Sequence, residues 1–179
     1  MTRLLALYDR AARLADRQSD WLLPCLARLV FAGVLLGYFW ASAATKLVGP
    51  FSPTAGAYGQ IFPRAFEAVG FDESQLGLWH WAVAVAGAWA EFALPVLIVL
   101  GLFTRLAALG MMGFVAVQSL TDVYGHGVEA GAWFDRASDG LILDQRAFWV
   151  LLLVVLALKG AGPLSVDRIL HQASPRLPA

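Results

Sequence analysis

The sequence lacks both the cysteine pairs and the excess of charge that would place it in several large classes of protein. Cys25 is the single cysteine among 179 residues, which excludes an intrachain disulfide and any electron transfer through paired cysteines. Charged residues make up 15% of the chain, against about 25% in soluble domains. Thirteen basic residues balance thirteen acidic ones without a basic run, so nothing favours a nucleic-acid partner.

The chain instead has an excess of apolar residues and carries them in four long runs. Hydrophobic residues make up 59% of it, against about 45–50% in soluble domains. A helix of about 20 apolar residues crosses the ~30 Å hydrocarbon core of a bilayer. The runs therefore predict an all-α fold class, a polytopic membrane protein with a four-transmembrane-helix bundle. The predicted spans cover about 26–45, 79–102, 106–121 and 147–160.

Two short segments flank the membrane domain that we predict over residues 21–172. In residues 3–17, leucines and alanines recur at helical spacing and arginines take the opposite face. This pattern predicts an amphipathic helix within residues 1–20 that lies in the membrane interface. The alternative is a cytosolic helix that packs on its own protein. Residues 173–179 are rich in proline and are predicted to be a disordered tail.

The distribution of Lys and Arg predicts the orientation in the membrane. The N-terminal segment, the turn at 103–105 and the C-terminal segment together hold nine of these residues. The two long connections, 47–77 and 122–147, with the residues next to them hold four. Because basic residues collect on the cytoplasmic side, both termini are predicted to be cytoplasmic, in a bacterial inner membrane.

Glu91 lies in the middle of the second predicted span, where an acid is unusual. A carboxylate at this depth costs several kcal/mol unless it is paired, hydrated or protonated. Pro95, four residues later, removes the N–H that would bond the Glu91 carbonyl in a helix. Two interpretations remain open. Glu91 is a catalytic residue that exchanges protons beside a bound quinone or along an ion path, or it only fixes the packing of the helices.

Gln118 and Lys46 are the polar residues expected near Glu91 from neighbouring spans. Counted from the short turn at 103–105, Gln118 falls at nearly the depth of Glu91 on the next antiparallel helix, which favours a hydrogen bond between them. Lys46 closes the first span about two turns higher. A contact between Lys46 and Glu91 would therefore be stretched.

Asp122, His126 and His80 fall on the predicted outer side of the membrane. With Lys46 and Gln118, the residues Asp122 and His126 are expected to shape the outer half of a cofactor-binding pocket. The two histidines form either a proton acceptor or metal site at the outer mouth, or a pair of ordinary interfacial side chains. Their spacing is not that of a metal-binding motif, so no metal site is predicted.

Short motifs in a fixed order make the chain resemble the DoxX family of bacterial membrane proteins. The likeness covers roughly residues 28–168 and rests on these features: Arg28, a glycine-bearing first span closed by Lys46, Glu91, the turn Gly101-Leu102-Phe103-Thr104-Arg105, His126, and the segment Gly160-Ala161-Gly162-Pro163-Leu164-Ser165-Val166-Asp167. The long aromatic first loop and the extended second loop depart from the smallest members of that family.

The resemblance implies a function, because this family is similar to the membrane subunit of thiosulfate:quinone oxidoreductase. We therefore expect a membrane subunit of a redox complex that is linked to quinone as its cofactor. Its expected partners are the lipid bilayer and either a protein subunit or a second copy of the chain. Two alternatives stay open. One is a non-catalytic accessory or assembly protein for a periplasmic partner, and the other is a carrier of a small solute or metal.

Overall fold

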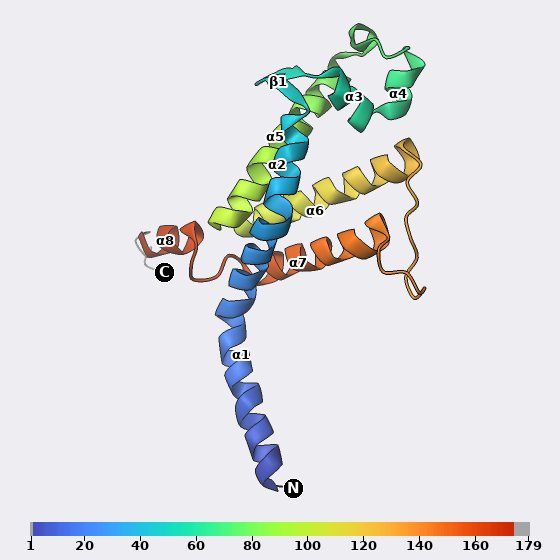
Figure 1. The fold of residues 1–179 in the computed structure, drawn as a ribbon. Helices are drawn as coiled ribbons and strands as arrows, with labels where there is room; N and C mark the ends of the chain where they lie inside the picture. The colour runs from blue at the N-terminus through green and yellow to red at the C-terminus, as the bar shows by residue number, and fades with distance from the viewer. Residues whose placement is uncertain (1, 174–179) are drawn as a thin grey trace.

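Four long helical segments form the frame of the protein in a computed structural model, which describes residues 2–173 (Figure 1). Each is long and apolar enough to cross a membrane, which confirms the predicted all-α membrane fold. The segments, in order, are α1 (Thr2–Phe31) with the π-helical turn η1 (Ala32–Leu36) and α2 (Gly37–Ala44); α5 (Leu78–Leu100); α6 (Thr104–Leu120) with η3 (Thr121–Gly125); and η4 (Leu141–Gln145) with α7 (Arg146–Lys159).

The first helix runs without a break from its amphipathic start into the first span. Pro24 lies inside α1, and the N-terminal part of α1 projects from the bundle (Figure 1). The apolar side chains of this part, such as Leu4, Leu7 and Leu14, are exposed. This exposure is what an interfacial helix requires, and the interfacial placement stays a prediction. Of the predicted disordered tail, residues 174–179 lie outside the described residues.

One end of the bundle, here called the turn end, is closed by short connections. Gly101 ends α5 in the left-handed conformation at φ 69°, which lets α6 return directly beside it. The segment after α7 leads into the short helix α8 (Val166–Ala173), whose Asp167 accepts hydrogen bonds from the N–H groups of Phe103 and Thr104. These groups lack helical partners, so the carboxylate caps the start of α6.

The opposite end, here called the loop end, carries the small elements and the connection between α6 and α7. The small elements are β1 (Leu47–Gly49), which pairs antiparallel with β2 (Ser52–Pro53); α3 (Ala55–Ile61); α4 (Pro63–Ala68); and the 3₁₀ turn η2 (Glu73–Gln75). Tyr58 and Phe66 bury their rings against Ala84 of α5. The first connection is therefore a packed structure on the end of the bundle.

The main core lies between the spans nearer the turn end. Its largest fully buried side chains include Phe31, Ile98, Met111 and Leu153, one from each of the four spans. From their shared turn, α5 and α6 diverge toward the loop end (Figure 1). The core thus fixes the helices at one end and leaves them spread at the other.

Candidate functional site

The spread between the spans holds a cavity of about 600 Å³. It extends from the loop end to a floor of small and apolar residues on α5 and α6. Its polar lining consists of Tyr38, Ser42, Lys46, Gln60, Glu91, Gln118, Thr121, Asp122, His126 and Arg146. All five site residues predicted from the sequence therefore lie around one cavity.

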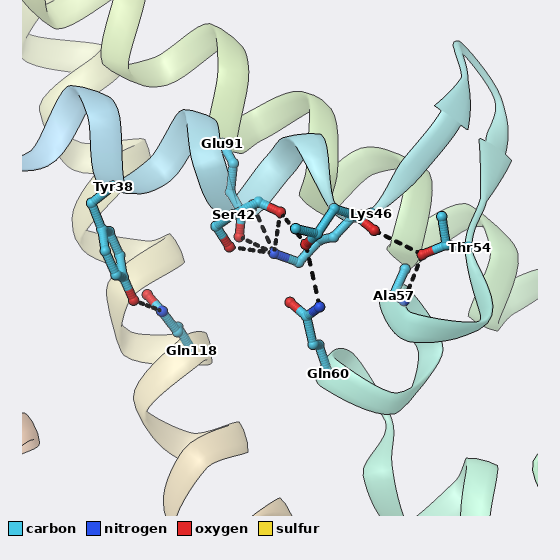
Figure 2. A network of polar contacts seen from close by, with 9 residues as sticks. Tyr38, Ser42, Lys46, Thr54, Ala57, Gln60, Glu91 and Gln118 are labelled. Carbon is cyan, nitrogen blue, oxygen red and sulfur yellow. Dashed lines mark hydrogen bonds and ion pairs between the residues drawn. The ribbon is translucent and has the colours of Figure 1, made fainter.

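Lys46 and Glu91 form a buried ion pair on one wall of this cavity (Figure 2). Lys46 Nζ lies 2.9 Å from Glu91 Oε1 and 2.8 Å from Oε2, and it donates to Ser42 Oγ at 2.6 Å. The two residues are only 4% and 3% exposed. A charge at this depth is stable only with a close partner of opposite charge. Each of the two residues therefore offsets the cost of burying the other.

The lysine reaches the acid because its side chain runs back along its own helix. Lys46 lies two residues after the end of α2 at Ala44, and Ser42 of that helix lies one turn before Lys46. The amine thus descends by about one turn, ~5 Å, and meets Glu91 across the contact between α2 and α5. The Lys46–Glu91 contact, which the sequence predicts to be stretched, is therefore the central interaction of the site.

Gln118 does not bond Glu91, and that prediction is wrong. Its Nε2 donates instead to Tyr38 Oη at 3.0 Å (Figure 2). The helix bounds explain the error, because α5 ends at Leu100 and α6 already begins at Thr104. Along the helices Glu91 is then ~14 Å from the turn and Gln118 ~21 Å, so they lie at different depths.

A second ion pair, between the buried Arg146 and the half-buried Asp122, lies on another part of the wall. The Arg146 guanidinium contacts the Asp122 carboxylate and donates to Ser119 Oγ at 2.9 Å. Arg146 is only 3% exposed, and its guanidinium lies 5.9 Å from the centre of the Trp149 ring. This pair fixes the start of α7 to the end of α6.

Arg146 is a site residue that the sequence pattern does not predict, because it falls in the predicted second loop, 122–147. The run Leu141-Ile142-Leu143 before it is the available signal. In the structure η4 extends the fourth span back to Leu141, so Arg146 lies inside the span. A cation one turn inside an apolar segment calls for an acidic partner, which Asp122 provides.

Two buried polar atoms that border the cavity have no hydrogen-bond partner. They are Gln118 Oε1, an acceptor, and Arg146 Nε, a donor. An unpaired buried polar atom costs about 1–3 kcal/mol, so such atoms are usually matched by water or a ligand. Both residues line the cavity, and Arg146 also lines a second hollow between α6 and α7, so the two atoms are unpaired groups buried in the cavity wall.

The two histidines lie in different surroundings. His126 is exposed at the mouth of the cavity, with its Nε2 3.0 Å from the Gln60 carbonyl oxygen. His80 packs its ring edge-on against Phe62 and does not line the cavity. Within residues 2–173, no three His, Cys, Asp or Glu side chains are grouped so that they could hold a metal ion.

The fold and the cavity define a class, a four-helix membrane protein with a ligand-sized space between its spans and a buried ion pair in the wall. The chain belongs to the DoxX family, whose model matches residues 23–121. The matched region includes α2, α5 and α6, and with them the Lys46–Glu91 pair and Gln118. No curated protein and no solved structure matches the chain.

Proposed function

We propose that the protein is the membrane subunit of a redox complex and that its cavity binds the head group of a quinone. The observation that supports this proposal is the Lys46–Glu91 pair, a buried ion pair whose carboxylate can take up a proton, held beside a cavity large enough for such a head. A quinone that accepts or gives up electrons also exchanges protons, so its site needs a titratable group shielded from bulk solvent.

The free polar atoms of the cavity fit both redox forms of a quinone. The oxidised head presents two carbonyl oxygens, which accept hydrogen bonds, and Arg146 Nε is a free buried donor. The reduced head presents hydroxyl groups, which also donate, and Gln118 Oε1 is a free buried acceptor. Tyr38 Oη, already held by Gln118, presents its hydroxyl to the same space.

In this proposal the Glu91 carboxylate takes up and releases the exchangeable proton, and its neighbours hold the carboxylate in place. The carboxylate is fixed at both oxygens by Lys46 Nζ, and Ser42 orients the amine. Gln118 and Asp122 border the half of the cavity nearer the loop end, and His126 stands at its mouth. Protons would therefore exchange with solvent at the loop end rather than at the closed turn end.

The same proposal includes an orientation and a partner. With nine Lys and Arg on the side of the termini and four on the other, the protein lies in a bacterial inner membrane with both termini cytoplasmic. The loop end then faces the periplasm, where a partner subunit or second copy docks. The lipid-facing sides of the four spans contact the bilayer.

The first test is chemical, on wild-type protein purified in a mild detergent. Solvent extraction and mass spectrometry should recover a quinone in near-stoichiometric amount. Glu91→Gln should slow quinone-linked turnover in membranes at least tenfold, because the amide cannot carry a proton. Glu67→Gln, which changes an exposed acid on α4, is the matched control and should leave turnover unchanged. Unchanged turnover in Glu91→Gln would overturn the proposed role of Glu91.

A second candidate function is that of a non-catalytic accessory protein for a periplasmic partner. It is favoured by the large aromatic side chains that the loop end exposes, namely Phe51, Phe71, Trp133 and Phe134. Large aromatic side chains are enriched at docking surfaces. Purified protein that carries no quinone but retains a stoichiometric partner chain, lost when Trp133 and Phe134 are changed to Ser, would favour this function.

A further inference from the structure

The cavity has an opening between α5 and α6 that the proposed function does not use. Near the turn end these helices are in contact, since a Cβ atom added at Gly110 would lie 3.2 Å from Leu94 Cδ2. One turn farther along, a Cβ atom added at Gly113 would meet nothing within 4 Å. Gly113 also lines the cavity and is exposed. The two helices therefore separate between Gly110 and Gly113.

The rim of this opening is apolar and lies within the membrane spans. Ala86 of α5 and Val117 of α6 line the cavity from its two sides and are exposed. Both residues fall inside the segments long and apolar enough to cross a membrane. In a bilayer the opening would thus face lipid chains rather than water.

The other seams between the spans are bridged by side chains, beside separate hollows of about 540 Å³ along α6 and α7 and about 390 Å³ between the first span and α7. Met111 and Leu153 are fully buried where α6 meets α7. On the other side of α5, the Lys46–Glu91 pair and a hydrogen bond from Trp40 Nε1 to the Phe92 carbonyl join it to α2. At the cavity, the seam between α5 and α6 is bordered by Ala86, Gly113 and Val117, and a Cβ atom added at Gly113 would meet nothing within 4 Å.

We propose that this seam is a lateral portal, occupied by the single apolar tail of an amphiphile that enters the cavity from the bilayer. The inference rests on the proposed function, and it names the substrate class as a quinone with a single long apolar tail. The head lies at the polar lining, where the buried Arg146 keeps an unpaired donor atom. The tail passes Gly113 and leaves between Ala86 and Val117.

The arrangement places polar and apolar parts of the ligand in matching surroundings. Gln118, which holds the head, lies more than one turn along α6 from Gly113. A larger side chain at Gly113 therefore narrows the path of the tail without replacing a hydrogen-bonding group. Gly33 provides a matched control. It is also an exposed glycine within a span, and a Cβ atom added there would meet nothing within 4 Å. Unlike Gly113, it does not line the cavity.

The test compares two quinones with the same head in full-length protein reconstituted in lipid nanodiscs. One probe is a dimethoxy-methyl-benzoquinone with a decyl tail, and the other is the same ring without the tail. Binding is measured by quenching of tryptophan fluorescence. Gly113→Leu should weaken binding of the tailed quinone at least tenfold and change binding of the tailless one by less than twofold. Gly33→Leu should leave both affinities within twofold of the wild type.

The controls separate failure of the portal from failure of the proposed function and from misfolding. Gly113→Ala, which fits the space, should give a smaller loss for the tailed quinone than Gly113→Leu, and both should melt near the wild-type temperature. If wild-type protein binds neither quinone, the proposed function fails and the portal with it. If it binds both, but Gly113→Leu weakens them equally or not at all, only the portal is overturned.

Discussion

The turn end and the loop end of the bundle use polar groups in opposite ways. At the turn end, Arg28 donates to the carbonyl oxygens of Ile98, Val99, Ala161 and Leu164, and so joins the end of α5 to the segment after α7. Its three guanidinium nitrogens all have partners. At the loop end, Gln118 and Arg146 each keep a buried atom without one.

This difference separates the part of the protein that holds the helices together from the part that encloses the cavity. Charge-assisted hydrogen bonds to backbone groups at helix ends make a rigid junction. The spans leave that junction close together and separate along their length, so the same four helices form a packed core at one end and a cavity at the other. Changes at the turn end should therefore affect stability alone, and changes in the cavity should affect both stability and binding.

The largest expected effect on stability is that of Arg28→Met. It removes the guanidinium donor from four backbone carbonyls, of which that of Ile98 keeps the N–H of Gly101, at a cost of about 3–6 kcal/mol. The measurement is the midpoint of thermal unfolding in detergent, with the exposed Arg10→Met as control. Quinone affinity at a temperature where the variant is folded should stay near the wild-type value. A loss of quinone affinity in the folded variant would show that the turn end also affects binding.

Lys46→Met should come next, because it leaves Glu91 buried without its ion partner. Such a loss typically costs about 3–5 kcal/mol, whereas replacing both charges often costs little. We therefore expect the double variant Lys46→Met/Glu91→Leu to recover most of the stability. Unlike Arg28→Met, it should also abolish quinone-linked turnover. A double variant as unstable as the sum of the two single variants would show that the pair is not a coupled unit.

Asp167→Ala should have the smallest effect, about 1–2 kcal/mol, because it removes the cap of α6. Burial raises the pKa of Asp167, but hydrogen bonds from Thr104 and Phe103 outweigh burial and hold the pKa below its ordinary value. A carboxyl group with a lowered pKa stabilises the fold at all pH values above its unfolded pKa of about 3.9. That stabilisation is lost as the pH falls through the lowered value.

The pH dependence gives this prediction its control. The difference in unfolding midpoint between wild type and Asp167→Ala should be constant from pH 7 to pH 5 and shrink below about pH 4. Asp9→Ala, at an exposed position of α1, should follow the wild type throughout. A difference that persists unchanged to pH 3 would mean that the Asp167 carboxylate does not act through its charge.

The sequence interpretation succeeded where the signal is local and failed where it depends on register. The four spans follow from runs of apolar residues, and the site residues follow from their polarity within or next to those runs. The Glu91–Gln118 bond failed because a shift of a few residues in where α5 ends and α6 begins changes the relative depth by more than one turn. The burial of Arg146 was not predicted, because it depends on η4 extending the fourth span toward the loop end.

By itself the sequence determined that this is a four-helix membrane protein with an acid inside its second span, because membrane insertion depends on the composition of each segment. The tertiary structure decided which cation pairs with that acid, that Arg146 is buried, and where the cavity lies. Those features arise from the divergence of α5 and α6 beyond Gly110 and from the backward reach of Lys46 along α2. Both depend on how whole helices pack, which no single segment encodes.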